Sequence, residues 1–313
     1  MIMEAIKEAW VFVAMPSEKA PVLAGRLVTD GNRGRFVYGQ NYLSRADRFA
    51  LDPINLPLVE HTQEVLGNDG VPTVLLDAGP DNWGRTLMLA LHTRYPQNKL
   101  EELLATKGTG VGAVRVSLSR TAPKAPPEYL EMSSLKDINE NIQTLIESGQ
   151  ITPELLKQLE PGSMMGGARP KSVVKADDGS LHIAKFTRPD DIFDQSKAEQ
   201  MSYLMMRESG ITTAESELIN VAGQSIILVK RFDVEPGYRR HFISAHALMY
   251  QPRVRQNQLE AYFSYPALSD LILKIGTCDN DRAELFRRMV FNVAIGNTDD
   301  HLRNHGFLKK YRK

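Results

Sequence analysis

The chain has 313 residues, 42% of them hydrophobic and 24% charged, which are ordinary values for a folded globular protein. Lys plus Arg and Asp plus Glu each number 38, so net charge gives no general attraction to nucleic acid or to an anionic membrane. The single Cys278 excludes an intrachain disulfide. The N-terminal residues do not form a signal peptide, and no apolar run reaches the roughly 18 residues of a membrane span. We therefore expect a cytoplasmic protein with no membrane segment.

The first 120 residues are expected to form an α/β module. Strands are predicted at 10–13 and 34–38, and a helix is predicted to open at 81–85. A glycine-rich segment at 108–112 precedes a further strand at 113–116. Those glycines fit a tight turn better than a phosphate-binding loop, although both interpretations stay open.

Three prolines within residues 121–127 indicate a linker, and a second domain is expected over 128–313. Its first part, about 150–235, alternates helical and strand patterns, and 236–313 is mainly helical. The predicted elements are helices at 135–146, from 152, at 195–207 and beyond 261, and hairpins around Asp178-Gly179 and Ala222-Gly223. Apolar residues are expected on the buried faces of two helices: Met201, Leu204 and Met205 on one, and Leu285, Phe286, Met289, Val290 and Val293 on the other.

The segment 162–171 is a loop of small residues directly before a predicted hairpin. Backbone amides at Gly166, Gly167 and Ala168 can approach phosphate oxygens closely because little side chain intervenes. Lys185 in the hairpin would place a positive charge beside those phosphates. Glu199, in the following helix, would hold Lys185 by an ion pair. The alternatives are a solvent-facing lysine and an exposed helix glutamate.

Near the end of the chain stands Gly296-Asn297-Thr298-Asp299-Asp300-His301-Leu302-Arg303-Asn304. An Asp followed five residues later by an Asn is the spacing of a kinase catalytic loop. There the Asp accepts the proton of the substrate hydroxyl and the Asn binds Mg²⁺. The alternative is that Asp299 and Asp300 form a solvated acidic pair. His301 and His305 have no third partner at metal-ligand spacing, so zinc is poorly supported.

Together these segments resemble one family, the HipA-like serine/threonine kinases, which are toxins of bacterial type II toxin–antitoxin modules. The resemblance rests on 166–171, 183–186, 229–233 and 296–304, in that order. In the N-terminal part, 77–85 resembles the family's signature and 111–113 its following turn. It implies an α+β, protein kinase-like two-lobed fold that carries an N-terminal α/β module.

The resemblance also implies a role for each matching residue. Asp299 would be the catalytic base and Asn304 a ligand of Mg²⁺. Ser163 would be a site of autophosphorylation, although a plain loop or cap serine is the alternative. ATP would be bound by Met165, Gly166, Gly167, Ala168, Arg169, Pro170, Lys171, Lys185, Glu199, Lys230, Arg231, Phe232, His301 and Asn304.

By the same resemblance the protein phosphorylates a protein hydroxyl, for known members that of an aminoacyl-tRNA synthetase. Its partner would be a HipB-like helix-turn-helix antitoxin, and operator DNA would be bound through that antitoxin.

The chain departs from the family after Asn304. The family continues to an Asp in a Pro-x-Tyr-Asp context and then to several helices, whereas this sequence reaches Lys313 with neither. From this we expect a C-terminally truncated member with an incomplete helical lobe and uncertain activity. A catalytically inactive homologue that binds the antitoxin or its DNA complex is the second hypothesis. A small-molecule kinase is a third, which the N-terminal signature disfavours.

Overall fold

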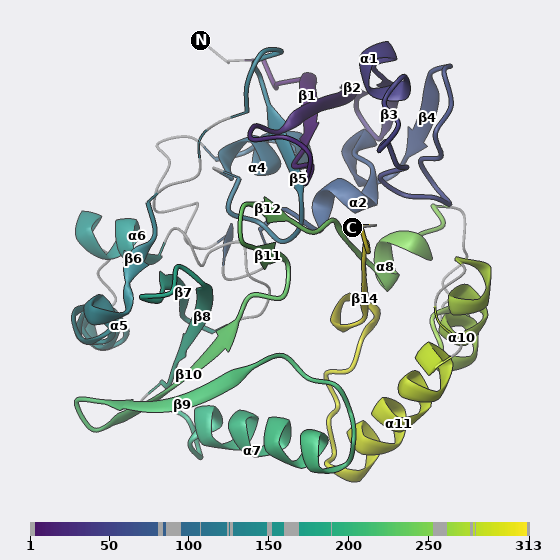
Figure 1. The fold of residues 1–313 in the computed structure, drawn as a ribbon. Helices are drawn as coiled ribbons and strands as arrows, with labels where there is room; N and C mark the ends of the chain where they lie inside the picture. Colours follow the sequence, from purple (N-terminus) through teal and green to yellow (C-terminus); the bar gives the residue numbers. More distant parts are fainter. Residues whose placement is uncertain are drawn as a thin grey trace.

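The structure is a computed structural model that describes residues 4–80, 84–85, 95–106, 108–123, 125, 128–148, 152–159, 169–188, 190–252, 262–275, 278 and 280–311. Two five-stranded sheets and several helices give a mixed α/β fold, with the first sheet at the top of Figure 1 and the second at its lower left. None of the described helices is long and apolar enough to cross a membrane.

The first sheet has the strand order β4-β3-β2-β1-β5, and every neighbouring pair is antiparallel. Its strands are β1 (Glu8–Val13), β2 (Val22–Asp30), β3 (Arg33–Tyr38), β4 (Gln63–Leu66) and β5 (Val114–Ser117). The helices on this side of the molecule are α1 (Gln40–Leu43), α2 (Thr73–Leu76) and α4 (Lys99–Ala105). The strands predicted at 10–13, 34–38 and 113–116 are therefore confirmed. Asp81, Asn82 and Trp83 of the predicted helix lie outside the described residues.

The second sheet has the order β6-β7-β8-β10-β9, in which β6 and β7 are parallel and the other pairs antiparallel. Its strands are β6 (Leu130–Glu131), β7 (Lys171–Lys175), β8 (Leu181–Phe186), β9 (Ser216–Val221) and β10 (Gln224–Lys230). Both predicted hairpins are present.

The helices next to this sheet are α5 (Leu135–Ser148), α6 (Pro153–Leu159) and α7 (Gln195–Glu208). Ile138 and Ile142 of α5 are buried in the core of the sheet, as helical spacing predicts. Thr152 precedes α6 and accepts a hydrogen bond from the Leu155 amide at 3.2 Å, so it is the predicted N-cap.

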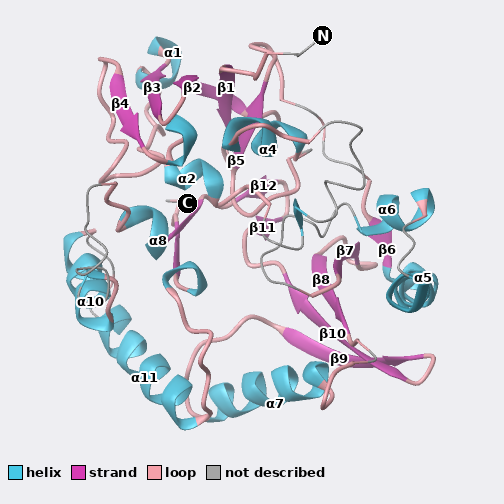
Figure 2. Ribbon diagram, turned by 180° about the vertical axis from the view of Figure 1, so that it is seen from behind, coloured by secondary structure: helices cyan, strands magenta, loops and turns pink. Residues whose placement is uncertain are grey.

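The described residues beyond β10 include two short antiparallel strand pairs and three helices. These are β11 (Val234–Glu235) with β12 (Tyr238–Arg239), β13 (Phe242–Ser244) with β14 (Gly306–Leu308), α8 (Ala245–Leu248), α10 (Tyr265–Lys274) and α11 (Asn280–Ala294). A 3₁₀ turn, η5 (Leu302–Asn304), precedes β14. Figure 2 shows from behind how α10 and α11 continue along the side of the molecule opposite β6 to β8.

The core of the first sheet is completed by this C-terminal part of the chain. Ile243, Leu248, Leu271 and Leu285 are buried in the same hydrophobic cluster as Val11 of β1. The division at residues 121–127 stays a prediction about domains. The packing shows that the chain leaves the first core after β5 and returns to it at β13.

Two faces that were expected to be buried are mostly exposed. On α11 the expectation is confirmed for Leu285, which is buried, but Phe286, Val290 and Val293 are exposed and Phe291 is buried instead. On α7, Met201, Leu204 and Met205 are exposed as well. Helical spacing shows which residues share a face, but it does not show whether another element covers that face.

Candidate active site

The predicted ion pair between Lys185 and Glu199 is present. Lys185 is in β8, between β7 and β10, and its Nζ lies 2.5 Å from Glu199 Oε1. Glu199 is in the first half of α7, whose N-cap Asp194 accepts a hydrogen bond from the Lys197 amide at 3.0 Å. Both partners are about one third exposed, so the ammonium stays accessible to a further anion.

Glu199 has a second neighbour, Tyr203, one turn further along α7. Burial raises the pKa of Tyr203, and the charge of Glu199 raises it further. The phenol therefore stays protonated at neutral pH and can donate to the carboxylate. Strand pairing on one side and the helix on the other thus fix the position of the Lys185 ammonium.

The predicted phosphate loop is described only at its end. Ser163, Met165, Gly166, Gly167 and Ala168 lie outside the described residues.

At the end of this loop, Arg169 donates to Asp191 Oδ2 at 2.6 Å, and this hydrogen bond lowers the pKa of Asp191. The Pro170 carbonyl accepts a hydrogen bond from the Phe186 amide at 3.2 Å. Lys171 was predicted to belong to the loop, but it is the first residue of β7 and is buried. Pairing of Lys171 with Lys185 across the two strands explains the difference, because the ladder begins one residue earlier than the sequence pattern indicates.

The segment 230–232, predicted to frame adenine, begins at the last residue of β10. Lys230 Nζ pairs with Glu215 at 2.9 Å on the surface, and Phe232 is partly exposed, with its ring 5.6 Å from that of Phe242. The amides of Lys230 and Arg231 donate to the carbonyls of Glu215 and Leu181, at 2.9 Å and 2.8 Å. These two amides therefore already donate hydrogen bonds within the protein, and adenine recognition here would depend on carbonyl groups or on Phe232.

Arg231 has a structural contact that sequence reasoning missed. Its buried guanidinium donates to both carboxylate oxygens of Asp233, at 3.0 Å and 2.7 Å, and to the carbonyls of Thr109 and Gly110, both at 3.0 Å. Asp233 in turn accepts from the Gly112 amide at 2.7 Å. The glycine-rich segment 108–112 is thus a turn that joins the first sheet to the chain after β10, as the tight-turn interpretation predicted. In the sequence, a sign of this buried pair was the presence of opposite charges, Arg231 and Asp233, on either side of Phe232.

The predicted catalytic loop lies between α11 and β14. The Asp299 carboxylate is 90% exposed, and the Asp299 carbonyl accepts a hydrogen bond from Asn304 Nδ2 at 2.5 Å. His301 Nε2 lies 3.8 Å from Asp299 Oδ1, and His301 is exposed too. The Asp and the Asn of the motif are therefore held together by a direct contact.

This contact also tests whether Asn304 fits Mg²⁺. With its amide nitrogen used by Asp299, Asn304 has its oxygen available, and oxygen is the ligand type that Mg²⁺ prefers. Within the described residues no group of three or more His, Cys, Asp or Glu side chains could hold a metal ion by itself. Asn304 therefore fits a site in which Mg²⁺ is also bound by the phosphates of a nucleotide, as Mg²⁺ commonly is.

Asp300 differs sharply from its neighbour Asp299, because its carboxylate is only 12% exposed. It accepts a hydrogen bond from Tyr265 of α10 and lies 3.0 Å from His305 Nε2. The interpretation of the two aspartates as a solvated pair is therefore wrong for Asp300. The contact with Tyr265 was not predictable from the sequence, because the two residues are 35 positions apart.

The two groups of predicted site residues are on different parts of the fold. Lys185 and Glu199 belong to β8 and α7, whereas Asp299, His301 and Asn304 precede β14 (Figures 1 and 2). The structure brings residues together within each group, and a nucleotide with its acceptor would have to connect the groups.

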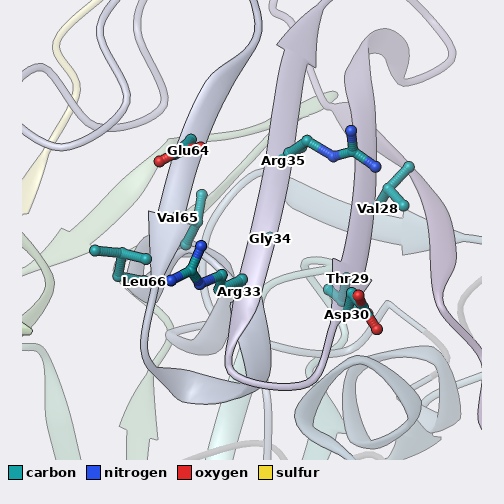
Figure 3. Close-up of a pocket in the computed structure, with 9 residues that line it drawn as sticks. All are labelled: Val28, Thr29, Asp30, Arg33, Gly34, Arg35, Glu64, Val65 and Leu66. Carbon is teal, nitrogen blue, oxygen red and sulfur yellow. The ribbon is translucent and has the colours of Figure 1, made fainter.

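A separate pocket lies on the first sheet (Figure 3). It is formed by β2, β3 and β4, and its polar lining includes Asp30, Arg33, Arg35 and Glu64. No predicted site residue lines it, so it is not part of the candidate active site.

Comparisons with known proteins agree with the order of these parts. Residues 20–117 match the family model of the HipA N-terminal domain, and residues 163–313 match that of the HipA-like C-terminal domain. Comparison with curated proteins gives no significant match.

Among solved structures, the fold is similar to a chain in the complex of the Shewanella oneidensis MR-1 toxin–antitoxin system HipA, HipB and its operator DNA. The TM-score is 0.65 at 17% identity, over 95% of this chain and 72% of that chain, and a likeness at this identity concerns the fold. From the two domain matches, in the order that the fold displays, the chain belongs to the HipA-like proteins.

Proposed function

We propose that the protein is a serine/threonine protein kinase and the toxin of a type II toxin–antitoxin module, acting in the cytoplasm with ATP and Mg²⁺. The observation that carries the proposal is the Lys185–Glu199 ion pair. Such a strand lysine and helix glutamate orient ATP phosphates in protein kinases, whose two-lobed fold we propose here too. The contact between Asp299 and Asn304 supplies the second half of the site.

In this mechanism Lys185 binds the α- and β-phosphates, and Glu199 holds its ammonium in place. Asn304 would hold Mg²⁺ through its amide oxygen. Bound Mg²⁺ would neutralise charge on the phosphates.

The exposed carboxylate of Asp299 orients the acceptor hydroxyl and takes its proton. The hydroxyl oxygen forms a bond to the γ-phosphorus, the bond from that phosphorus to the β,γ-bridging oxygen breaks, and ADP leaves with that oxygen.

The proposal extends to the residues that the structure leaves untested. Residues 165–170 would form the phosphate loop, 230–232 would frame adenine, His301 would lie beside the nucleotide, and Ser163 would be the site of autophosphorylation. A phosphate on Ser163 would add about −1.5 to −2 charges next to the nucleotide.

For partners, we propose a HipB-like antitoxin, with operator DNA bound through it. The similar fold of a HipA chain solved with HipB and operator DNA supports this. The substrate would be a protein hydroxyl, by family resemblance that of an aminoacyl-tRNA synthetase.

Two measurements on the purified chain test the kinase proposal: calorimetry of Mg²⁺-ATP binding, and intact mass after incubation with ATP. We expect binding and a gain of phosphate. Asp299→Asn should lower the transfer rate by about 10²- to 10⁴-fold, the usual contribution of a general base, without weakening ATP binding. Lys185→Met should weaken ATP binding.

The matched control is Asp177→Asn, because Asp177 is an exposed carboxylate in the turn between β7 and β8. It should leave both readouts unchanged. A folded chain that binds no Mg²⁺-ATP, or an Asp299→Asn variant that transfers phosphate at the original rate, would overturn the proposal. The first result would favour a binding module without catalytic activity.

A further inference from the structure

Asp300 connects the predicted catalytic loop to three other points of the chain. Its Oδ2 accepts a hydrogen bond from the Tyr265 hydroxyl at the start of α10, and its Oδ1 lies 3.0 Å from His305 Nε2. The same hydroxyl lies 3.4 Å from Asn292 Nδ2 of α11. Each carboxylate oxygen therefore has a donor, and Asp300 holds the loop directly to α10 and to the residue before β14, and to α11 through Tyr265.

Both donors are in the form that this contact needs. Burial, with the hydrogen bond to Asp300, raises the pKa of Tyr265 to about 12, so the phenol keeps its proton at neutral pH. His305 Nε2 lies at hydrogen-bond distance from Asp300, and an imidazole with its proton on Nε2 donates that proton to the carboxylate.

Asp299 and Asp300 differ sharply in exposure, because the first carboxylate is 90% exposed and the second 12%. The chain turns at Asp300, where the His301 amide donates to the Asp299 carbonyl at 3.2 Å, and the Asn304 amide donates to the His301 carbonyl at 2.8 Å. Because the two aspartates share one peptide unit, holding Asp300 in place also holds the backbone that presents Asp299 to the solvent.

Beside the loop the described protein has an open pocket of about 340 Å³. It is bordered by Asp300 and Leu302 of the loop, by Tyr265 and Leu268 of α10, and by His246 of α8. Atoms of the described residues do not fill this open pocket, so on this side the loop is held by the directional contacts of Asp300, while Leu302 packs against the first core.

We propose that Asp300 is a positioning residue, which through Tyr265 and His305 fixes the loop so that the Asp299 carboxylate faces the acceptor hydroxyl. The inference rests on the proposed kinase function. Asp300 contacts neither nucleotide nor acceptor in this scheme and acts only through Asp299 and Asn304. A displacement of about 1 Å at reacting groups can reduce a rate roughly 10²-fold, so the loss of one anchor is large enough to measure.

The test uses the full chain with Asp300→Asn, which keeps the shape and removes the charge, and Tyr265→Phe, which removes one donor. We expect kcat to fall by roughly 10²-fold in Asp300→Asn and less in Tyr265→Phe. Any rise in KM for ATP should be much smaller than the fall in kcat, because Lys185 and Glu199, which would bind and orient the phosphates, lie on other elements. The double variant should be no worse than Asp300→Asn alone, since both changes break the same contact.

Amide hydrogen exchange supplies a readout that needs no activity. In Asp300→Asn the amides of His301 and Asn304 should exchange faster, while those of β8 and β10 keep their protection. Asp177→Asn is the control and should change neither kinetics nor exchange.

Wild-type kcat with unchanged exchange in Asp300→Asn would overturn the inference, as would a rise in KM for ATP as large as the fall in kcat. Because exchange is measured without nucleotide, a wild-type chain that transfers no phosphate would count against the proposed function alone.

Discussion

The buried pair of Arg231 and Asp233 gives the sharpest test of how the parts of the fold are joined. Both side chains are at most 2% exposed, and the guanidinium contacts Asp233 through two hydrogen bonds. It also donates to the carbonyls of Thr109 and Gly110, which lie in the turn before β5. The change to make is Arg231→Met, which keeps most of the side-chain length and removes every donor.

The expected loss is about 3–5 kcal/mol of unfolding free energy, because removing one member of a buried ion pair leaves the other charge without compensation. In the variant, Asp233 still accepts a hydrogen bond from the Gly112 amide at 2.7 Å, and the Gly110 carbonyl still accepts one from Arg239 at 3.1 Å. The loss of unfolding free energy should therefore not exceed this range. This is a large share of the roughly 5–15 kcal/mol that stabilises a typical domain.

Urea unfolding at pH 7, followed by circular dichroism, measures this loss. Arg188→Met is the matched control, because Arg188 pairs with Asp190 on the surface and its loss should cost less than about 1 kcal/mol. The double variant Arg231→Met with Asp233→Leu should recover part of the stability, since the Asp233 carboxylate no longer stays buried without its Arg231 partner. A loss below about 1 kcal/mol in Arg231→Met, or a double variant no more stable than the single one, would refute the reasoning.

Two further predictions concern the N-terminal part. Burial raises the pKa of Asp77 from 3.8 to about 6, so its contribution to stability is complete below pH 3.8 and is lost as pH rises through 6. From pH 4 to pH 7 the stability of the wild type relative to Asp77→Asn should fall by up to about 3 kcal/mol, and a pH-independent difference in urea unfolding would contradict this. Gly110→Ala should cost about 1–3 kcal/mol, because a Cβ there would lie 2.1 Å from the Ala78 carbonyl oxygen. Gly39→Ala, whose nearest atom is at 3.9 Å, is the control, and equal effects of the two would exclude the steric explanation.

The elements and contacts that depend on residues close together in the chain could be predicted from the sequence. The hairpin of β7 and β8 follows from alternating residues around Asp178-Gly179, and α7 follows from spacing that ends at Gly210. The Lys185–Glu199 pair was predictable because a strand and the next helix bring residues fourteen apart together in a known arrangement.

Contacts over long sequence separations could not be predicted in this way. Arg231 meets Thr109 across 122 residues, and Tyr265 meets Asp300 across 35. Periodicity fixes the side of an element on which a residue lies, but the partner on that side depends on the whole fold. The exposed Phe286 and Val293 of α11 illustrate the same limit.

The return of the chain to its first core has a consequence for synthesis on the ribosome. Val11 and Leu27 of the first sheet are buried together with Leu248 and Leu271, and Phe307 packs against the same cluster. An N-terminal module often folds while the rest of a chain is still being made. Here the first core stays unfinished until Phe307 has emerged, and β14 directly follows the loop that carries Asp299. If Asp299 is the catalytic base, the loop that carries it reaches its place only when this core closes, so completion of the first core and catalytic competence arise together.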